Sequence, residues 1–317
     1  MSLFTTMGMF IIDENRYIDP PAPSQTDIIG GAGTYAIIGA RIVTELNKAH
    51  LISGIIDKGT DFPTSVLEEL KSWSTGIIYR KSDRLTTRGC NIYDKGIRYF
   101  EYLSPKLQIE VKDIIQYDQL KNSKSYHLIC SIDRCKSIVE DIISFNKETI
   151  FIYEPLPTDC IPENYEKLTK LLPYIHIFSP NLDEAEELTS KNLPLEDLAQ
   201  KFIKYQTKPN SGTVIRCGAQ GCYIRTTNNV TYTLPAYHQD QSKVIDVTGG
   251  GNSFLGSFSM GWILTQNWLM AGIFGNIGSG CIIEKLGMPT IEGDKFNGLS
   301  FKDRFTKYIK ENKIITH

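Results

Sequence analysis

The sequence lacks three features that would place it in a large class of proteins at once. It has no run of about 18 apolar residues, the length that a transmembrane helix needs. No basic segment accompanies the short apolar stretch near its start, as a signal peptide would require. Its formal net charge is only −2 over 317 residues, so no global positive field attracts nucleic acid or anionic lipid. We therefore expect a cytoplasmic protein that binds neither nucleic acid nor membranes directly.

The sequence also lacks closely spaced cysteine pairs. Its seven cysteines are odd in number, and the nearest pairs, Cys130 with Cys135 and Cys217 with Cys222, lie five residues apart. This spacing is wider than the CxxC pair of a zinc knuckle. We expect buried or free thiols in a reducing compartment.

The chain does contain a regular alternation of apolar, strand-like segments with helical segments. This order predicts a mostly parallel sheet with helices on both faces. Two segments break the alternation: a loop or short extended excursion at 15–26, with three prolines, and a hairpin at 84–103 around Asp94-Lys95-Gly96. Strands are predicted at 4–12, 51–56, 76–79, 126–131, 149–155, 174–180, 212–216, 221–226 and near 230–234. Helices are predicted at 33–46, 61–73, 133–145, 162–172, 182–189, 194–206, 252–265 and 268–286, with a surface helix near the C-terminus.

The stretch DVTGGGNSFLGSF (246–258) places three glycines between a strand-like segment and an apolar helix. Without Cβ atoms, Gly249, Gly250 and Gly251 allow a tight turn that presents successive N–H groups. The helix start adds further unpaired N–H groups and the positive end of its dipole. We interpret the triplet as an anion site, the alternative being a flexible turn capped by Thr248 or Asn252.

The stretch SPNLDEAEEL has two interpretations. Asn181 and Glu184 follow a strand at a spacing of three, in an acidic turn that could hold magnesium directly or through water. The same spacing is typical of a capping box. On spacing alone, we favour the cap over the metal.

The stretch DIIGGAGTYAIIGARIV matches a dinucleotide-binding fingerprint at Gly31-x-Gly33-x-x-Ala36, with Asp57 about 20 residues further on. This pattern supports an NAD-dependent oxidoreductase. However, a proline-rich loop precedes the glycines where the fingerprint needs a full strand. We therefore disfavour this interpretation and expect a glycine turn that opens a helix.

Two further segments contain candidate ligand residues. In VIRCGAQGCYI (214–224), Gly218 and Gly221 predict a hairpin turn, and Arg216 at the strand end could reach a phosphate. The glycine-rich helix AGIFGNIGSGCIIEKLGMP (271–289) is typical of close packing. It could also form the wall beside a flat adenine ring, with Asn276 available to that ring.

Taken together and in order, these pieces resemble the ribokinase family, also called the phosphofructokinase-B (PfkB) carbohydrate kinases. The resemblance runs from Gly8 to about Pro289. DVTGGGN matches the family signature D-x-T-G-A-G-D except at Gly250 and Asn252. Other family positions match Asp13, Gly30, Gly31, Asn181, Glu184, Gly218 and Gly221.

The resemblance implies a Rossmann-like α/β domain over 1–290, with a β-sheet lid inserted at about 13–26 and 84–103 and a helical tail over 291–317. It also implies ATP, Mg²⁺, a sugar or nucleoside-like acceptor and a homodimer formed through the lid. In this scheme Gly249, Gly250 and Gly251 form the anion hole, and Asn181 and Glu184 organise magnesium. The resemblance thus raises the metal interpretation of Asn181 and Glu184 above the capping box, although both can hold at once. Asp13, Gly30, Gly31 and Tyr35 contact the acceptor, and Arg216, Gly218, Gly221 and Asn276 contact the nucleotide.

The departures from the family pattern fall on the ligand sites. The family's last signature Asp is the general base, and the carboxamide of Asn252 is not basic near neutral pH. General base catalysis is worth roughly 10²–10⁴ in rate, so we expect severe impairment. Tyr35 and Arg216 replace a usual Asn and Thr, and Glu154-Pro155 stands where an Asp-containing strand end is common.

Our leading hypothesis is a pseudokinase-like protein that keeps an ATP or phosphate site and acts by binding or regulating a partner. The GGAGTYA and TGGGN variants are similar to a fungal branch named after a killer-maintenance protein, tied to persistence of a double-stranded RNA virus. The main alternative is an active sugar or nucleoside kinase in which Asp246 or a substrate-bound water replaces the base.

Overall fold

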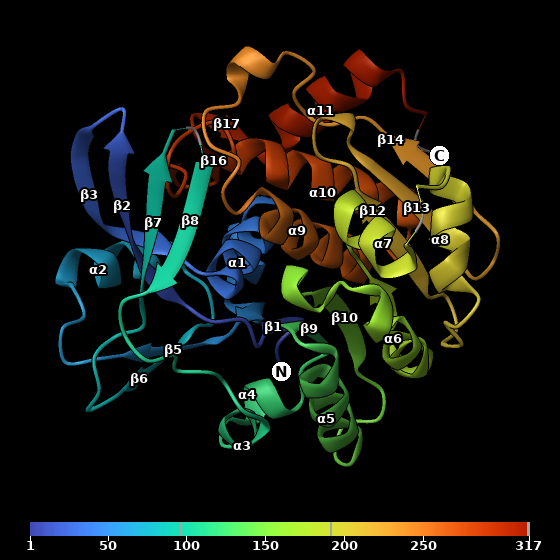
Figure 1. Cartoon of the computed structure of the whole chain (residues 1–317), viewed down its shortest axis with the longest axis horizontal. Coiled ribbons are helices and arrows are strands. Elements are labelled where there is room, and N and C mark those ends of the chain that lie inside the picture. The colour runs from blue at the N-terminus through green and yellow to red at the C-terminus, as the bar shows by residue number, and fades with distance from the viewer. Residues whose placement is uncertain (96, 191, 316–317) are drawn as a thin grey trace.

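An eight-stranded sheet runs through the centre of the molecule (Figure 1), in a computed structural model that describes residues 1–95, 97–190 and 192–315. Its order is β14-β13-β12-β11-β10-β9-β1-β4, and all pairs from β12 to β4 are parallel. At the other end of this sheet, β13 is antiparallel to both of its neighbours, β12 and β14. The predicted mostly parallel sheet is confirmed. Its strands are β1 (Phe4–Thr6), β4 (Ile52–Ser53), β9 (Ser125–Cys130), β10 (Ile150–Pro155), β11 (Ile177–Phe178), β12 (Gly212–Arg216), β13 (Cys222–Thr226) and β14 (Thr231–Leu234).

Helices cover both faces of this sheet. Successive residues of each strand point to opposite faces, so the apolar strands form an apolar core on each side. Ile150 and Ile152 of β10 belong to the apolar core beneath α1, α9 and α10, whereas Phe151 and Tyr153 belong to the core beneath α5 to α8. The helices are α1 (Ala32–Ile42), α2 (Thr64–Ser72), α3 (Val111–Ile114), α4 (Asp118–Lys121), α5 (Ile132–Ile143), α6 (Tyr165–Leu171), α7 (Leu182–Thr189), α8 (Leu195–Ile203), α9 (Gly250–Thr265), α10 (Trp268–Ile282) and α11 (Phe301–Asn312). Short 3-10 turns lie at Leu46–Leu51, Pro157–Asp159, Pro162–Asn164, Leu172–Tyr174, Gly218–Gln220 and Gln241–Lys243.

A separate four-stranded sheet, which we call the lid, stands beside the main sheet (Figure 1) in the order β3-β2-β7-β8. The predicted hairpin at 84–103 is present, although Gly96 of its turn lies outside the described residues. Of the two alternatives at 15–26, the loop is wrong and the extended excursion is present, since β2 and β3 form a second hairpin there. The predicted strand 4–12 is also two strands, so Asp13 lies in the lid. The lid strands are β2 (Ile11–Asp19), β3 (Ala22–Gly30), β7 (Arg88–Asp94) and β8 (Ile97–Tyr102), and β5 (Ile55–Lys58) pairs separately with β6 (Ile78–Lys81).

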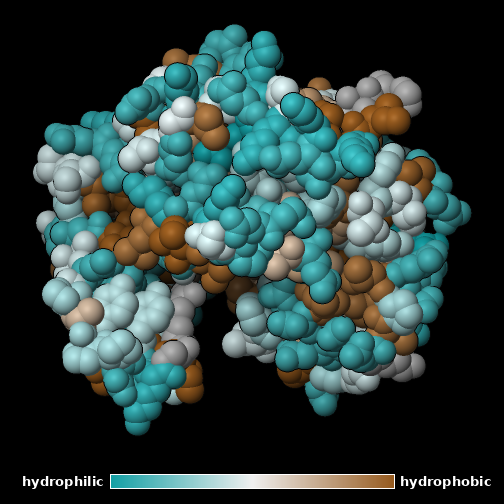
Figure 2. Space-filling view, turned by 90° about the horizontal axis from the view of Figure 1, so that it is seen from above, coloured by the Kyte–Doolittle hydropathy of each residue, from teal (hydrophilic) through white to brown (hydrophobic). Residues whose placement is uncertain are grey.

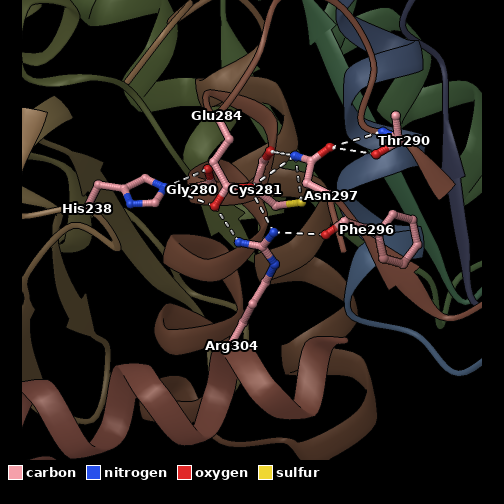
Figure 3. A network of polar contacts seen from close by, with 8 residues as sticks. All are labelled: His238, Gly280, Cys281, Glu284, Thr290, Phe296, Asn297 and Arg304. Carbon is pink, nitrogen blue, oxygen red and sulfur yellow. Dashed lines mark hydrogen bonds and ion pairs between the residues drawn. The ribbon is translucent and has the colours of Figure 1, made fainter. Parts of the chain in front are cut away.

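The C-terminal segment is more than the helical tail that the sequence predicts. Three short strands, β15 (Ile291–Glu292), β16 (Lys295–Phe296) and β17 (Leu299–Ser300), form a small sheet ahead of α11. Four polar residues, two buried and two partly buried, fasten this sheet and α11 to the end of α10 (Figure 3), and we call them the C-terminal cluster. Its members are His238, Glu284, Asn297 and Arg304.

The C-terminal cluster is centred on one carboxylate. Arg304 donates from Nη1 and Nη2 to the two oxygens of Glu284 at 2.6 and 2.8 Å, and Nη2 also donates to the carbonyl of Phe296 at 2.9 Å. Asn297 donates to Glu284 Oε2 at 3.0 Å. Burial alone would raise the pKa of Glu284, but these partners and His238 together lower it to about 2. The ionised carboxylate therefore stabilises the docking of the C-terminal segment.

Two expectations from composition can be compared with the structure. No helix in the described ranges is long and apolar enough to cross a bilayer. All seven cysteines are free thiols, and six of them are buried.

Candidate functional site

The ends of the parallel strands bring several predicted residues to one edge of the main sheet. β10 ends one residue after Glu154, and β12 ends at Arg216. Asn181 follows β11 and forms a parallel bridge with Arg216. The first turn of α9 reaches the same edge, since Gly251 lies against the Arg216 guanidinium. Ligands of open α/β sheets bind outside the carboxyl ends of the strands, so this edge is the candidate site.

The glycine triplet turns the chain into α9 and leaves backbone donors available. Gly249 has φ 76°, and α9 begins at Gly250. A Cβ on Gly249 would lie 2.1 Å from the ring of Tyr35, so only glycine fits there. Within the described ranges, no acceptor is hydrogen-bonded to the backbone N–H groups of Gly251 and Asn252. Such groups at a helix start attract anions. This geometry suits the predicted anion hole, whose role stays a prediction.

Asn252 does not project into an empty base position, because its side chain is held by a buried carboxylate. Its Nδ2 donates to Glu154 Oε2 at 3.0 Å. Glu154 is only 4% exposed and also lies 2.6 Å from Arg216 Nη1, through its other oxygen. His127 Nε2 lies 3.4 Å from Glu154 Oε2. We call His127, Glu154, Glu184, Arg216 and Asn252 the Arg216 cluster.

The charge of Glu154 is stabilised by its neighbours. Burial alone would raise the pKa of this carboxyl, but Arg216, His127 and Asn252 together lower it to about 2. A carboxylate with so low a pKa, and with both oxygens engaged, is a weak proton acceptor. Glu154 is therefore a poor substitute for the missing base.

Asn181 and Glu184 form the capping box that we favoured on spacing alone. Asn181 Oδ1 accepts the backbone N–H of Glu184 at 2.8 Å, and Glu184 Oε2 accepts that of Asn181 at 2.7 Å. The same Glu184 oxygen lies 3.4 Å from Arg216 Nη2. Burial raises the pKa of Glu184, although Arg216 opposes the shift.

These contacts do not fit a magnesium ion held at this place. Mg²⁺ prefers six oxygen ligands in a near-octahedral arrangement. Between Glu154 and Glu184 the structure instead places the guanidinium of Arg216, with its own positive charge. Across the described residues, no three His, Cys, Asp or Glu side chains gather in a way that could hold a metal. The metal role of Asn181 and Glu184 stays a prediction that the donor set does not favour.

The four residues predicted to contact a nucleotide line a single cavity. Arg216, Gly218, Gly221 and Asn276 surround it, together with Gly250 and Gly251 of the triplet. Asn276 is buried and donates to the hydroxyl of Tyr308 at 3.2 Å. The remaining wall is mainly apolar, with Ala236, Tyr237, Val244, Val247, Phe254 and Ile283. Apolar walls with a few polar groups at one end are typical of ligand sites.

The residues predicted to contact an acceptor are less closely grouped. Asp13 is buried in the lid, where its carboxylate occupies the space that a Cβ on Gly30 would need. Gly31 caps α1. Tyr35 is 4% exposed and packs under Gly249, so its ring belongs to the core. Their acceptor roles stay predictions.

A second cavity lies between the lid side and the main sheet, near Gly31. Its lining includes Met7, Met9, Ile11, Tyr102, Lys106 and Arg134. Seen from above in Figure 2, the surface is hollowed between the lid side of the molecule and the remainder.

The glycines of the dinucleotide fingerprint lie where a lid strand leads into α1, not where a strand of the main sheet does. The strand before α1 is β3, which belongs to the lid and not to the main sheet. Asp57, the proposed ribose ligand, is paired with Arg80 at 2.5 and 2.9 Å. The NAD interpretation is therefore wrong, because neither the strand nor the acidic residue has the required surroundings.

Sequence reasoning missed two members of the Arg216 cluster as site residues. His127 lies inside β9 and is fully buried, and its Nδ1 is hydrogen-bonded to Thr6 at 3.0 Å. Glu154 was noted only as a departure from the family pattern. A charged residue within an apolar strand is the one available signal, because buried charges need partners.

Comparisons with known proteins show the family and the fold of the chain. Residues 74–291 match the sequence profile of the pfkB family carbohydrate kinases. Protein MAK32 of Saccharomyces cerevisiae is 36% identical, with 99% of this chain and 93% of that protein covered. An uncharacterized protein of Schizosaccharomyces pombe is 34% identical over 96% of this chain and 92% of its own length.

Among solved structures, a putative ribokinase II from E. coli in complex with ATP and Mg²⁺ has a TM-score of 0.72. It is 18% identical, and the match covers 98% of this chain and all of that one. At this level of identity, the likeness supports the fold.

Proposed function

The chain belongs to the pfkB family of carbohydrate kinases, and from that premise we propose that it binds ATP or a related phosphate-bearing ligand but transfers phosphate poorly or not at all. The observation that carries the proposal is the hydrogen bond from Asn252 to Glu154. An amide that donates to a buried carboxylate cannot also take the proton of an acceptor hydroxyl.

The nearby carboxylates do not compensate for the missing base. The pKa of Glu154 is lowered to about 2. Asp246 accepts the backbone N–H of Thr248 at 3.0 Å and so helps to shape the turn before the triplet. Without a base, the rate falls by roughly 10²–10⁴, while binding through backbone donors and apolar walls is unaffected.

The ligand class follows from the cavity. Phosphate oxygens suit the start of α9, and a flat base suits the apolar wall between Tyr237, Val247 and Phe254. The solved relative that contains ATP supports the nucleotide as the first ligand to test. The acceptor would be a sugar, a nucleoside or a similar hydroxyl compound.

Calorimetric titration with ATP, combined with a phosphate-transfer assay over a panel of sugars and nucleosides, tests this proposal. We expect ATP binding without turnover. Ala219→Trp is the binding control, because Ala219 is exposed at the cavity and a large ring there blocks it. Robust turnover by the wild type would exclude the pseudokinase assignment, and absence of ATP binding would exclude the retained site.

Restoring the base requires two changes. In Asn252→Asp a new carboxylate would face Glu154, and two close carboxylates tend to share a proton. We therefore expect little gain from this change alone. The double change Asn252→Asp with Glu154→Gln supplies a carboxylate with an uncharged neighbour. If the double variant phosphorylates an acceptor that the wild type does not, only the base was missing.

The resemblance to the killer-maintenance branch leads us to propose further that the protein acts by binding in the maintenance of a double-stranded RNA virus. The test uses a virus-carrying Saccharomyces cerevisiae strain that lacks its relative. Virus retention with the wild-type chain but not with Ala219→Trp supports the proposal. Failure of the wild-type chain to restore the virus contradicts it.

A further inference from the structure

Arg216 occupies a position where three parts of the molecule meet. Its Nη1 lies 2.6 Å from Glu154 of β10, and its Nη2 lies 3.4 Å from Glu184 of α7. Nη2 also donates to the carbonyl of Ser179 at 3.1 Å. The side chain is 10% exposed and lines the cavity beside α9. Its Nε is buried and has no hydrogen-bond partner in the described part of the chain.

The third glycine of the triplet makes room for this guanidinium. A Cβ on Gly251 would lie 2.3 Å from Arg216 Nη1, too close for any other residue without moving the arginine. Arg216 thus lies directly beside the first turn of α9. A positive charge is unfavourable at a helix start, where the dipole is also positive. Here the two carboxylates offset it, and an anion bound at the helix start would offset it further.

The positive charge that a divalent metal would bring to these carboxylates is already present. Glu154 directs one oxygen to Arg216 and the other to Asn252 and His127, so both are engaged. Oε2 of Glu184 accepts the backbone N–H of Asn181 in the capping box and also accepts from Arg216 Nη2. A metal bound here would displace the guanidinium or lie against it, and like charges repel strongly at such a short distance.

Arg216 is also suited to bind phosphate directly. A guanidinium presents a planar fork of donors that matches two phosphate oxygens. The contact of Nη2 with Glu184 is long at 3.4 Å, so a phosphate oxygen can replace this carboxylate. Nη2 keeps its hydrogen bond to the Ser179 carbonyl, and Nη1 keeps its 2.6 Å contact with Glu154. A phosphate at the helix start would then meet backbone donors on one side and the guanidinium on the other.

We propose that Arg216 takes the place of the divalent metal, so that this site binds nucleotide phosphates without Mg²⁺. The inference rests on the proposed function, because it concerns the ligand of the same cavity. It adds that metal dependence, the expected property of a kinase nucleotide site, has been replaced by a charge from the chain itself.

The test is calorimetric titration of the purified chain with ADP, once with a chelator and once with excess Mg²⁺. We expect the two dissociation constants to agree within about threefold, since the fixed guanidinium is present in both conditions. A gain of more than about tenfold with Mg²⁺ would overturn the metal-free site and leave the proposed function standing. Absence of ADP binding in both conditions would overturn the two together.

Two variants show whether Arg216 is the reason. In Arg216→Thr, we expect ADP binding in chelator to weaken by about tenfold or more, and Mg²⁺ to restore part of it. Arg216→Lys is the matched control, because it keeps the charge and loses only the fork, so its binding should stay independent of Mg²⁺. If both variants bind as the wild type does, Arg216 has no such role.

Thermal unfolding provides a measurement that needs no ligand. In Arg216→Thr, two buried carboxylates lose their partner, and we expect added Mg²⁺ to raise the melting temperature by several degrees. The wild type should change by no more than about one degree, because its own cation is in place. Equal stabilisation of both proteins by Mg²⁺ would contradict the proposal. If Arg216→Thr does not fold, the titrations of the wild type and Arg216→Lys still decide.

Discussion

The C-terminal cluster and the Arg216 cluster are built from the same four side-chain types, histidine, glutamate, asparagine and arginine, yet they hold the arginine differently. Arg304 places its fork on both oxygens of Glu284, at 2.6 and 2.8 Å. Arg216 divides its fork between Glu154 at 2.6 Å and Glu184 at 3.4 Å, and it lines a cavity. A guanidinium whose two terminal nitrogens both bind one carboxylate holds two segments together. A guanidinium that is shared between two carboxylates can exchange one of them for a ligand.

The largest effect that we expect concerns the C-terminal cluster. Arg304→Met leaves Glu284 without its main partner. Loss of one partner from a fully buried pair costs about 3–5 kcal/mol, and we expect a loss at or below the lower end of this range because Glu284 is 20% exposed. Urea denaturation measures this loss. Lys302→Met is the control, because Lys302 is exposed on the same helix. Equal stability of the two variants would show that the cluster does not fasten α11.

Acid sensitivity is the second measurement. The folded-state pKa of Glu284 is about 2, below its usual value near 4.5. A lowered pKa means that the carboxylate stabilises the fold above about pH 4.5 and loses this contribution as the pH falls towards 2. Unfolding free energies between pH 5 and pH 3 should therefore fall more steeply for the wild type than for Glu284→Gln. Parallel curves would contradict the assignment.

A smaller effect is expected at Asn252. Asn252→Asp places a carboxylate beside Glu154, and adding Glu154→Gln removes the repulsion. A double-mutant cycle in urea should give a coupling energy of about 0.5–3 kcal/mol, the range for residues in direct contact. A coupling near zero would mean that the amide does not hold Glu154, and the resemblance between the two clusters would weaken.

The smallest effect on stability is expected at the lid, away from both clusters. Ile97 and Tyr99 of β8 are more than half exposed, and we propose that they contribute to a homodimer formed through the lid. Tyr99→Glu should shift the chain from dimer to monomer in sedimentation velocity and change the unfolding free energy by no more than about 0.5 kcal/mol. A wild-type chain that sediments as a monomer would rule this dimer out.

Much of the fold could be read from the sequence, because local periodicity and turn residues mark the elements. The bounds predicted for α7 and β12 agree with the structure. The resemblance placed residues 13–26 in the lid, but the prolines left a loop open as an alternative to the hairpin of β2 and β3. Pro20 and Pro21 lie at its turn, and Pro23 lies in β3, at the edge of the lid. An edge strand tolerates proline, since one side of it needs no ladder hydrogen bond.

The candidate site could be predicted only in part. Arg216, Gly218, Gly221 and Asn276 were named from short motifs, and the structure brings them to one cavity. The acceptor role of Tyr35 stays a prediction, and only the structure shows that its ring packs beneath Gly249. A motif identifies which residues are near a turn, whereas the direction of a bulky side chain depends on the packing around it.

The sequence by itself determined that the signature ends in an amide, so the carboxylate needed for proton transfer is absent whatever the fold does around it. It also determined that three glycines stand at the start of a helix, since backbone freedom is a property of the residue type. Only the tertiary structure decided that Asn252 meets Glu154, 98 positions away, and that Arg216 lies between two carboxylates. These residues come together because parallel strands end at one edge of the sheet, and that register is not written in any short stretch of the chain.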